Sequence, residues 1–272
     1  MDLITLCDRI YLPVEIREKV IAYYNTADFS QTESFLEGLK NRDTEAQVRR
    51  ELEKILEPDP GKIKILTCML QCGADLYRWY EEKGIPEQIF FDTMGCFTRF
   101  IKECREMTGV WAFDREWWTG RQISGNLFRI GELEYEMLDD SERKVSIHIP
   151  SDAVLTREKC DASMEAAEDF FARFFPDYQD RDYICESWLL APELKELLPR
   201  DSHILDFQRR FRIQKVDYSG EDYREWVFKT KNARIADFPE NTRLQKNMKR
   251  YLLEGGKIGN GFGVWIKRKN HD

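Results

Sequence analysis

The spacing of apolar residues indicates helices in the first part of the chain. From residue 1 to about 110, apolar positions recur every three or four residues, as on one face of an amphipathic helix. No run here has the period of two that a half-buried strand would show. Residues suited to helix ends punctuate the pattern, among them Pro13, Thr44, Gly84 and Gly109. The predicted helices begin at Pro13, run from Thr44 to before Pro58, from Lys62 to Glu82, and from Pro86 to Met107.

From Asn126 to Leu190 the pattern changes to that of strands around one helix. The apolar residues Leu133, Tyr135 and Met137 alternate with Glu132, Glu134 and Glu136, and Val145, Ile147 and Ile149 alternate in the same way with Ser146, His148 and Pro150. Residues 183–190 are nearly continuously apolar, which is typical of a strand buried on both faces. Between them, residues 161–175 carry a helical apolar face, with Asp161 or Ser163 as the expected N-cap. Two paired strands, a crossover helix and a buried strand predict a mixed α+β or α/β sheet.

The aromatic cluster between Trp111 and Trp118, followed by Gly120 and Gly125, indicates the junction of the two parts. We therefore expect a helical domain over residues 1–112 and a sheet domain over residues 113–272. The aromatic side chains form either a packed interface or the wall of a ligand cleft. Beyond residue 190, we expect short helices at 192–198 and after Ser202, strands at 211–216 and 223–228, a helix from Thr242 to Leu253, and a final strand at 263–267.

Composition limits the classes of function. The chain has 272 residues, 42% of them hydrophobic, which is ample for a core, and its net charge of −8 argues against general nucleic-acid binding. The charge is uneven: residues 229–269 contain 11 Lys or Arg and 3 Asp or Glu, a local +8, which leaves −16 for the remainder. This basic segment is suited to a polyanionic ligand or to the acidic body of the same chain, or it is a solvated face that balances the acidic half.

Cysteine and histidine usage gives no metal signature. The seven cysteines include no C-x-x-C pair, and the three histidines are scattered, so we predict no structural metal. The opening Met-Asp-Leu-Ile, without a basic run and a long apolar core, predicts no signal peptide, and no apolar window approaches the roughly 18 residues of a membrane span. We expect a cytoplasmic protein with reduced cysteines, with a small-molecule substrate and without a membrane or nucleic-acid partner.

The glycine run from Gly255 to Gly263 does not fit a phosphate-binding loop. Such a loop follows a strand and opens a helix, whereas this run leaves a predicted helix and enters a predicted strand. A helix C-cap followed by a turn explains it better.

Four short motifs resemble a bacterial family of acyltransferase-domain proteins. They are Phe128-Arg-Ile-Gly-Glu-Leu-Glu-Tyr-Glu136, Ile147-His-Ile-Pro150, Ser187-Trp-Leu-Leu190 and Phe207-Gln208. In that family a helical N-terminal domain precedes a GNAT-like C-terminal domain, and the resemblance spans nearly the whole chain. It implies that acetyl-CoA or another acyl-CoA is the co-substrate, held where two parallel strands splay apart, with its pyrophosphate at the N-terminus of the intervening helix. The strands at 144–149 and 183–190 and the helix at 161–175 have this order, but residues 151–160 lack the glycines of the usual GNAT loop.

The resemblance and the strand pattern together suggest the site residues. Acyl transfer needs a group that takes a proton from the attacking amine, and we expect Glu136 or His148 to be that base. The residues expected to bind the substrate are Glu134, Ser187, Trp188 and Gln208, and those expected to bind the cofactor are Ile149, Ser151, Thr156 and Ser163.

Other chemistries fit the sequence less well. Glu134 and Glu136 are neighbours on one strand face, which rarely allows two carboxylates to flank a glycosidic bond. Neither Cys185 nor Ser187 lies in a G-x-S-x-G elbow. The main hypothesis is an N-acyltransferase that moves an acyl group from acyl-CoA to a small amine. The alternative, favoured by the glycine-free loop, is a catalytically inactive GNAT-like module that binds a ligand or a partner.

Overall fold

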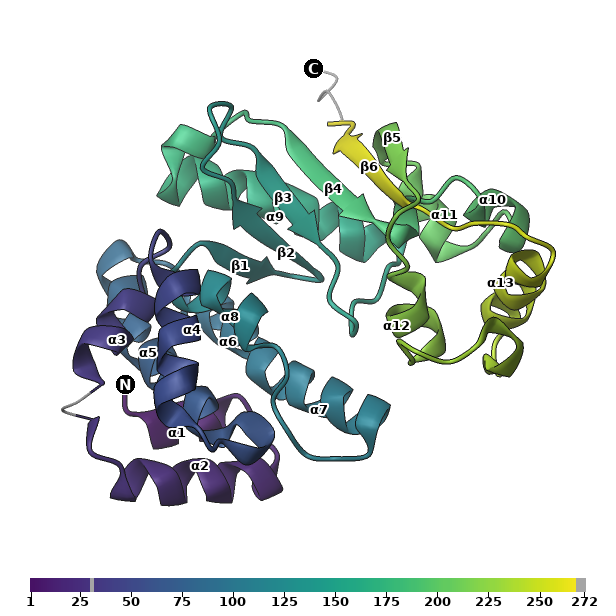
Figure 1. The fold of residues 1–272 in the computed structure, drawn as a ribbon. Coiled ribbons are helices and arrows are strands. Elements are labelled where there is room, and N and C mark those ends of the chain that lie inside the picture. Colours follow the sequence, from purple (N-terminus) through teal and green to yellow (C-terminus); the bar gives the residue numbers. More distant parts are fainter. Residues whose placement is uncertain (30–31, 268–272) are drawn as a thin grey trace. The chain divides into compact units, whose positions relative to one another are not determined.

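The computed structural model describes residues 1–29 and 32–267, and its internal contacts divide the chain into two units, Met1–Ile130 and Gly131–Asp272. Figure 1 shows the first as helices and the second as a sheet with flanking helices. The division falls further along the chain than the boundary expected after residue 112. The reason is local, because α8 (Glu116–Ile123) packs on α5 (Ile63–Lys83), and β1 (Leu127–Ile130) packs on α6 (Glu87–Met94).

The first unit is built around α5, whose residues are buried on most of its circumference. Helices α1 to α4, α6 and α8 all contact it. The remaining helices are α1 (Leu3–Arg9), α2 (Val14–Thr26), α3 (Glu33–Leu39), α4 (Glu45–Leu56) and α7 (Cys96–Thr108), with a short 3₁₀ turn, η2, at Pro60–Lys62. The prediction of a helical first half is confirmed.

One predicted helix of this unit is in fact two. The pattern from Pro86 to Met107 suggested a continuous helix, but α6 ends at Met94 and α7 begins at Cys96. Gly95 separates them, and its backbone N–H donates to the carbonyl of Phe91. A glycine tolerates this break because a Cβ there would lie 3.2 Å from the carbonyl oxygen of Asp92.

The second unit contributes the strands β2 to β6 to a mixed sheet, which confirms the predicted fold class. The six strands have the order β1-β2-β3-β4-β6-β5. Strands β2 and β3 are antiparallel, β3 and β4 are parallel, and β6 is antiparallel to both β4 and β5. The strands are β2 (Leu133–Met137), β3 (Val145–His148), β4 (Tyr183–Ser187), β5 (Phe211–Asp217) and β6 (Asn260–Trp265), and α9 (Arg157–Phe174) connects β3 to β4, followed by η3 (Pro176–Tyr178).

The boundaries of this region differ from those expected in three places. Gly131, at φ +64°, turns the chain between β1 and β2, so the first motif is two strands rather than one. The buried strand ends at Ser187, where the chain turns into the 3₁₀ segment η4 (Trp188–Leu190). Helix α9 starts at Arg157 with Thr156 as its N-cap, so neither Asp161 nor Ser163 caps it.

A helical cluster follows β4, with its own apolar core. It comprises α10 (Leu194–Leu197), α11 (His203–Gln208), α12 (Tyr223–Phe228), η5 (Ile235–Asp237) and α13 (Arg243–Leu253). The strand predicted at 223–228 is wrong, because this segment is α12. Its buried residues Tyr223, Val227 and Phe228 recur at helical spacing. In Figure 1 these helices gather beyond the end of β4.

The glycine run leaves α13 and enters β6, as the sequence predicted. Gly255 takes φ +88° just after the helix. Gly261 serves a different purpose, because a Cβ there would lie 2.4 Å from the carbonyl oxygen of Leu190. This glycine lets β6 pass directly against η4, the turn that ends β4.

No helix in the described part of the chain combines the length and the apolar character needed to cross a membrane.

Substitution of Gly261 tests this close approach. Gly261→Ala places a methyl group against a backbone carbonyl that cannot swing away, so we expect a loss of about 1–3 kcal/mol in the free energy of unfolding, measured in urea. The matched control is Gly220→Ala, whose methyl group would meet first the flexible Asn260 side chain at 3.1 Å. Equal stability of the two variants would contradict the role given to Gly261.

Candidate functional site: the splayed strands and the Glu136–His148 pair

The two parallel strands of the second unit are paired over a very short distance. The register of β3 with β4 contains two pairs, Val145 with Tyr183 and Ser146 with Ile184. Strand β4 then continues beside β6 as far as Ser187, which pairs with Gly261. The C-terminal ends of β3 and β4 therefore separate, at the edge of the sheet where ligands of open α/β folds bind.

A histidine and two glutamates lie on the strands beside this opening. His148 is the last residue of β3 and is directly opposite Glu134 on β2. Its Nε2 atom lies 2.8 Å from Oε2 of Glu136, two residues further along β2. The side chains of His148 and Glu136 keep 22% and 13% of their exposure, so the pair is largely sheltered but still reachable. This contact places the two side chains on the same face of the sheet.

Burial makes Glu134 different from a residue on a solvated face. The strand pattern placed it on a wet surface, yet it is 2% exposed. In the register of the two strands its backbone lies directly opposite that of His148. The 2.8 Å contact with Glu136 fixes the orientation of the imidazole ring on this face of the sheet.

The loop before α9 is held together by a carboxylate instead of glycines. Oε2 of Glu132 accepts a hydrogen bond from the Val154 backbone N–H at 2.8 Å, and its Oε1 is 2.7 Å from Nζ of Lys159. The N–H groups of Ala153 and Thr156 donate to the carbonyls of Pro150 and Val154. This internal pairing explains how a loop without glycine keeps its shape.

The start of α9 is fixed by Thr156 and by ionic contacts from α11 and the chain just after it. The Thr156 hydroxyl accepts from the Lys159 N–H. Arg210, whose side chain is 9% exposed, lies 2.8 Å from both Asp161 and Asp206 and donates to the Arg157 carbonyl. Asp206 also pairs with Arg157. The N-terminal turn of α9 is thereby held rigidly beside α11.

Burial alone would raise the pKa of Asp206, but its hydrogen bond to Arg210 and the charges of Arg210, Arg157 and Arg209 outweigh it and lower that pKa. The pairs Arg157–Asp206 and Arg210–Asp161 each span 49 residues of the chain, and no local sequence signal reveals them.

Ser163 lies within α9 and faces the interior. It is 2% exposed, and its hydroxyl accepts from the Leu133 N–H and lies 2.9 Å from the hydroxyl of Tyr135. Gly131 leaves room for it, since a Cβ there would be 3.2 Å from the Ser163 Cβ. Burial raises the pKa of Tyr135 well above its usual range, and the hydrogen bond with Ser163 acts in the opposite direction. The structure thus places Ser163 as a link between α9 and β2.

The remaining predicted residues lie around the end of β4. Ser187 accepts through its hydroxyl from the Leu189 N–H, and Trp188 is half-buried against the helical cluster. Gln208 is 2% exposed and donates from Nε2 to the carbonyls of Leu189 and Ala191, while its Oε1 has no partner in the described residues. It therefore clamps η4 from α11. Ile149, which is half-buried, and Ser151, which is exposed, follow β3.

Comparison with protein-family models finds two matches. An N-acyltransferase N-terminal domain matches residues 1–125, and a GNAT-like C-terminal domain matches residues 127–265. The chain therefore belongs to the family of proteins with a GNAT-like C-terminal domain.

Solved structures show that the GNAT-like protein shares its fold with acyltransferases. An acyltransferase in complex with decanoyl-CoA matches with a TM-score of 0.78 and 22% identity, covering 96% of this chain and 86% of that chain. The same values describe a complex with decanoyl-CoA and teicoplanin. A mutant acyltransferase in complex with octanoyl-CoA matches with a TM-score of 0.79 and 21% identity over 97% and 87%. A search of curated proteins finds no match.

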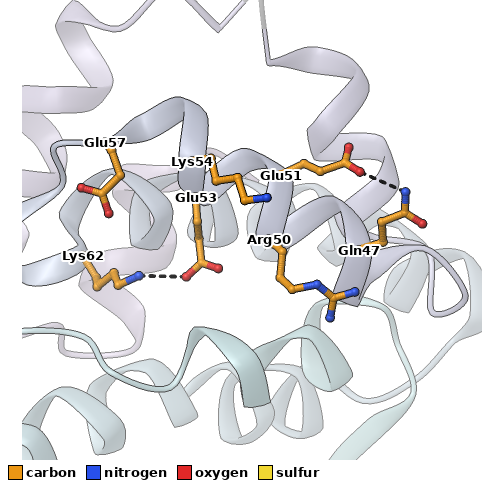
Figure 2. A pocket seen from close by; sticks show the side chains of 7 residues that line it. All are labelled: Gln47, Arg50, Glu51, Glu53, Lys54, Glu57 and Lys62. Carbon is orange, nitrogen blue, oxygen red and sulfur yellow. Dashed lines mark hydrogen bonds and ion pairs between the residues drawn. The ribbon is translucent and has the colours of Figure 1, made fainter.

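The helical unit of this GNAT-like protein has a surface hollow of its own. It has a volume of about 390 Å³ and is lined mainly by charged side chains of α4. Figure 2 shows Lys62 paired with Glu53 and Gln47 with Glu51 around it. Its charges largely neutralise one another, and its lining contains no histidine, cysteine or serine. The hollow is therefore bordered by paired surface charges of the helical unit.

The link between α9 and β2 can be tested with a double-mutant cycle. Ser163→Ala leaves the buried Tyr135 hydroxyl and the Leu133 N–H without this partner, so we expect a loss of about 1–3 kcal/mol in the free energy of unfolding. Adding Tyr135→Phe removes one of the stranded groups and should recover part of that loss. Strictly additive losses would show that the two hydroxyls are not coupled.

The ionic anchor of α9 predicts a dependence of stability on pH. Since the folded state lowers the pKa of Asp206, its ion pairs contribute stability at neutral pH that is lost as the pH falls through the folded-state pKa. Asp206→Asn should therefore lower the melting temperature at pH 7 and reduce its fall below about pH 4. A parallel downward shift at every pH would contradict this assignment.

Proposed function

We propose that this protein transfers an acyl group from acyl-CoA to an amine. The observation that supports this most is the opening between β3 and β4 with the Glu136–His148 pair beside it, within a domain of the GNAT-like family. The acceptor is proposed to be a small amine. The binding of teicoplanin by one structural neighbour suggests that larger acceptors should be tried as well.

The proposed reaction is a direct transfer. The acceptor nitrogen attacks the thioester carbonyl, the C–N bond forms and the C–S bond breaks. The proton lost by the nitrogen passes to His148, either directly or through a water molecule, and Glu136 stabilises the imidazolium. The CoA sulfur leaves as a thiolate and takes up a proton to become the free thiol.

Binding of the donor is assigned to the opening and to the start of α9. Acyl-CoA is a polyanion, and the first turn of α9 presents backbone N–H groups together with the exposed cations Arg157 and Lys159. We propose that Ile149, Ser151 and Thr156 contact the donor. For the acceptor side we propose Glu134 and Ser187, with Trp188 and Gln208 shaping the adjacent turn.

The alternative is a module that binds a ligand without catalysis. The observation that favours it is the loop before α9, where Glu132 already accepts from the Val154 N–H. A carboxylate in this position competes with a phosphate for the same donors.

Thermal-shift titration distinguishes the proposal from its alternative. Octanoyl-CoA and CoA should both raise the melting temperature, because a ligand at 100 times its Kd stabilises the folded state by about 2.7 kcal/mol. Glu136→Gln and His148→Ala should retain this shift, while release of free CoA thiol in the presence of a panel of amines falls about 10²–10⁴-fold. Absence of any shift at millimolar CoA would overturn donor binding. Donor binding without thiol release by the wild-type protein under any amine would favour the inactive module.

A further inference from the structure

The outward face of α13 carries a compact set of unneutralised cations. Arg243, Lys246 and Arg250 are exposed and follow one another at spacings of three and four residues, so they lie on one side of the helix. Leu253, which is 58% exposed, continues this side of the helix, and Lys257 is exposed in the turn that follows it. Within residues 1–29 and 32–267, these four cations have no ion pair at all. We call this set the cationic face.

The charge of this face stands out against the rest of the protein. Residues 243–257 contain five Lys or Arg and one Asp or Glu, a local +4 in a chain whose net charge is −8. Lys249, on a neighbouring line of the helix, is neutralised by Glu240 at 2.8 Å. The four cations of the face thus form a positive patch on an acidic protein, and the charges of Lys246 and Arg250 help to lower the pKa of Glu240 nearby.

The face is held in one orientation by contacts on the other side of α13. Thr242 and Gln245 form a capping box at its start, and Gln245 also donates to the Val227 carbonyl. Asn247 donates to the Leu197 carbonyl at 2.8 Å. Met248 and Leu252 are buried in the core of the helical cluster. A preorganised charged surface loses little entropy when a partner binds.

The same core connects the cationic face to the candidate site. Trp188, which follows the last residue of β4, packs against the cluster that contains Met248 and Leu252. The residue that follows the splayed strand and the buried side of α13 therefore pack on the same apolar core. A partner bound on the outward side of this helix would be separated from that core by about one helix diameter, roughly 10 Å.

We propose that the cationic face of α13 docks a small acidic carrier protein that presents the acyl group on a phosphopantetheine arm. This inference rests on the proposed acyl transfer, because CoA and carrier proteins share that arm and the same thioester. The bond changes are those given above, and the carrier thiol takes the place of the CoA thiol. The carrier supplies negative charge for the four cations and an apolar contact for Leu253.

Extended polyanions fit this surface less well. Residues outside 229–269 carry a net −16, so the chain as a whole disfavours an extended polyanion such as a nucleic acid or a flat anionic membrane. Membrane insertion also requires an apolar helix face, and that of α13 is buried in the cluster. A compact acidic partner would contact only the patch.

The test measures binding of a bacterial fatty-acid-synthase carrier protein that holds an octanoyl chain through a non-hydrolysable thioether. We expect the wild-type protein to bind it in a salt-sensitive manner. Lys246→Glu with Arg250→Glu should weaken binding at least about tenfold, and Lys246→Gln with Arg250→Gln should weaken it less. The control is Lys19→Glu with Lys102→Glu, which changes the net charge equally at exposed positions of the helical unit and should leave carrier binding unchanged. All variants should bind octanoyl-CoA as the wild type does.

Each other result has a defined meaning. Carrier binding that survives the charge reversal, or binding of octanoyl-CoA without any binding of the carrier, overturns the docking proposal and leaves the acyl-CoA reaction standing. If the wild-type protein binds neither the carrier protein nor octanoyl-CoA, the proposed function itself is contradicted. Binding to anionic vesicles, or self-association of the protein, that disappears in the Glu variant would assign the face to a membrane or to a second copy and overturn the carrier proposal.

Discussion

The sheet of the second unit depends on how its two parallel strands are held together. Strands β3 and β4 share two residue pairs, whereas β2 with β3 and β4 with β6 each share four. Helix α9 strengthens this weak junction because it touches both sides of it. The Ser163 hydroxyl accepts a hydrogen bond from the Leu133 N–H on β2, and the ring of Phe171 packs edge-on against that of Tyr183 on β4. The strands can therefore part at their C-terminal ends while the sheet remains one body.

The polar residues at this opening are arranged by the sheet rather than by loops. Glu134, Glu136 and His148 are adjacent because β2 and β3 run in register, so their separation is set by backbone pairing. The loop that follows β3 is stabilised differently, through Glu132 and the N-cap Thr156. Rigid strands therefore position the proposed proton-transfer groups, and a carboxylate-braced loop borders the proposed donor site.

Patterns with a short period could be read from the sequence. The alternation of Leu133, Tyr135 and Met137 predicted β2 and one of its faces, and Thr242 predicted the start of α13. The pattern failed where the cause lies far away in the chain. Glu134 reads as a solvent-facing residue, yet it is buried. The segment from Tyr223 reads as a strand, but packing against the helical cluster makes it a helix. Arg210 gives no local sign that it anchors α9, since its partner Asp161 is 49 residues earlier.

The short ladder between β3 and β4 also makes the sheet mechanically uneven. Few backbone hydrogen bonds oppose a widening of this seam, whereas the antiparallel ladders on both sides resist shear over their whole length. The most compliant line through the sheet thus coincides with the proposed donor site. Widening that gap would break fewer backbone hydrogen bonds than widening either of the antiparallel ladders beside it.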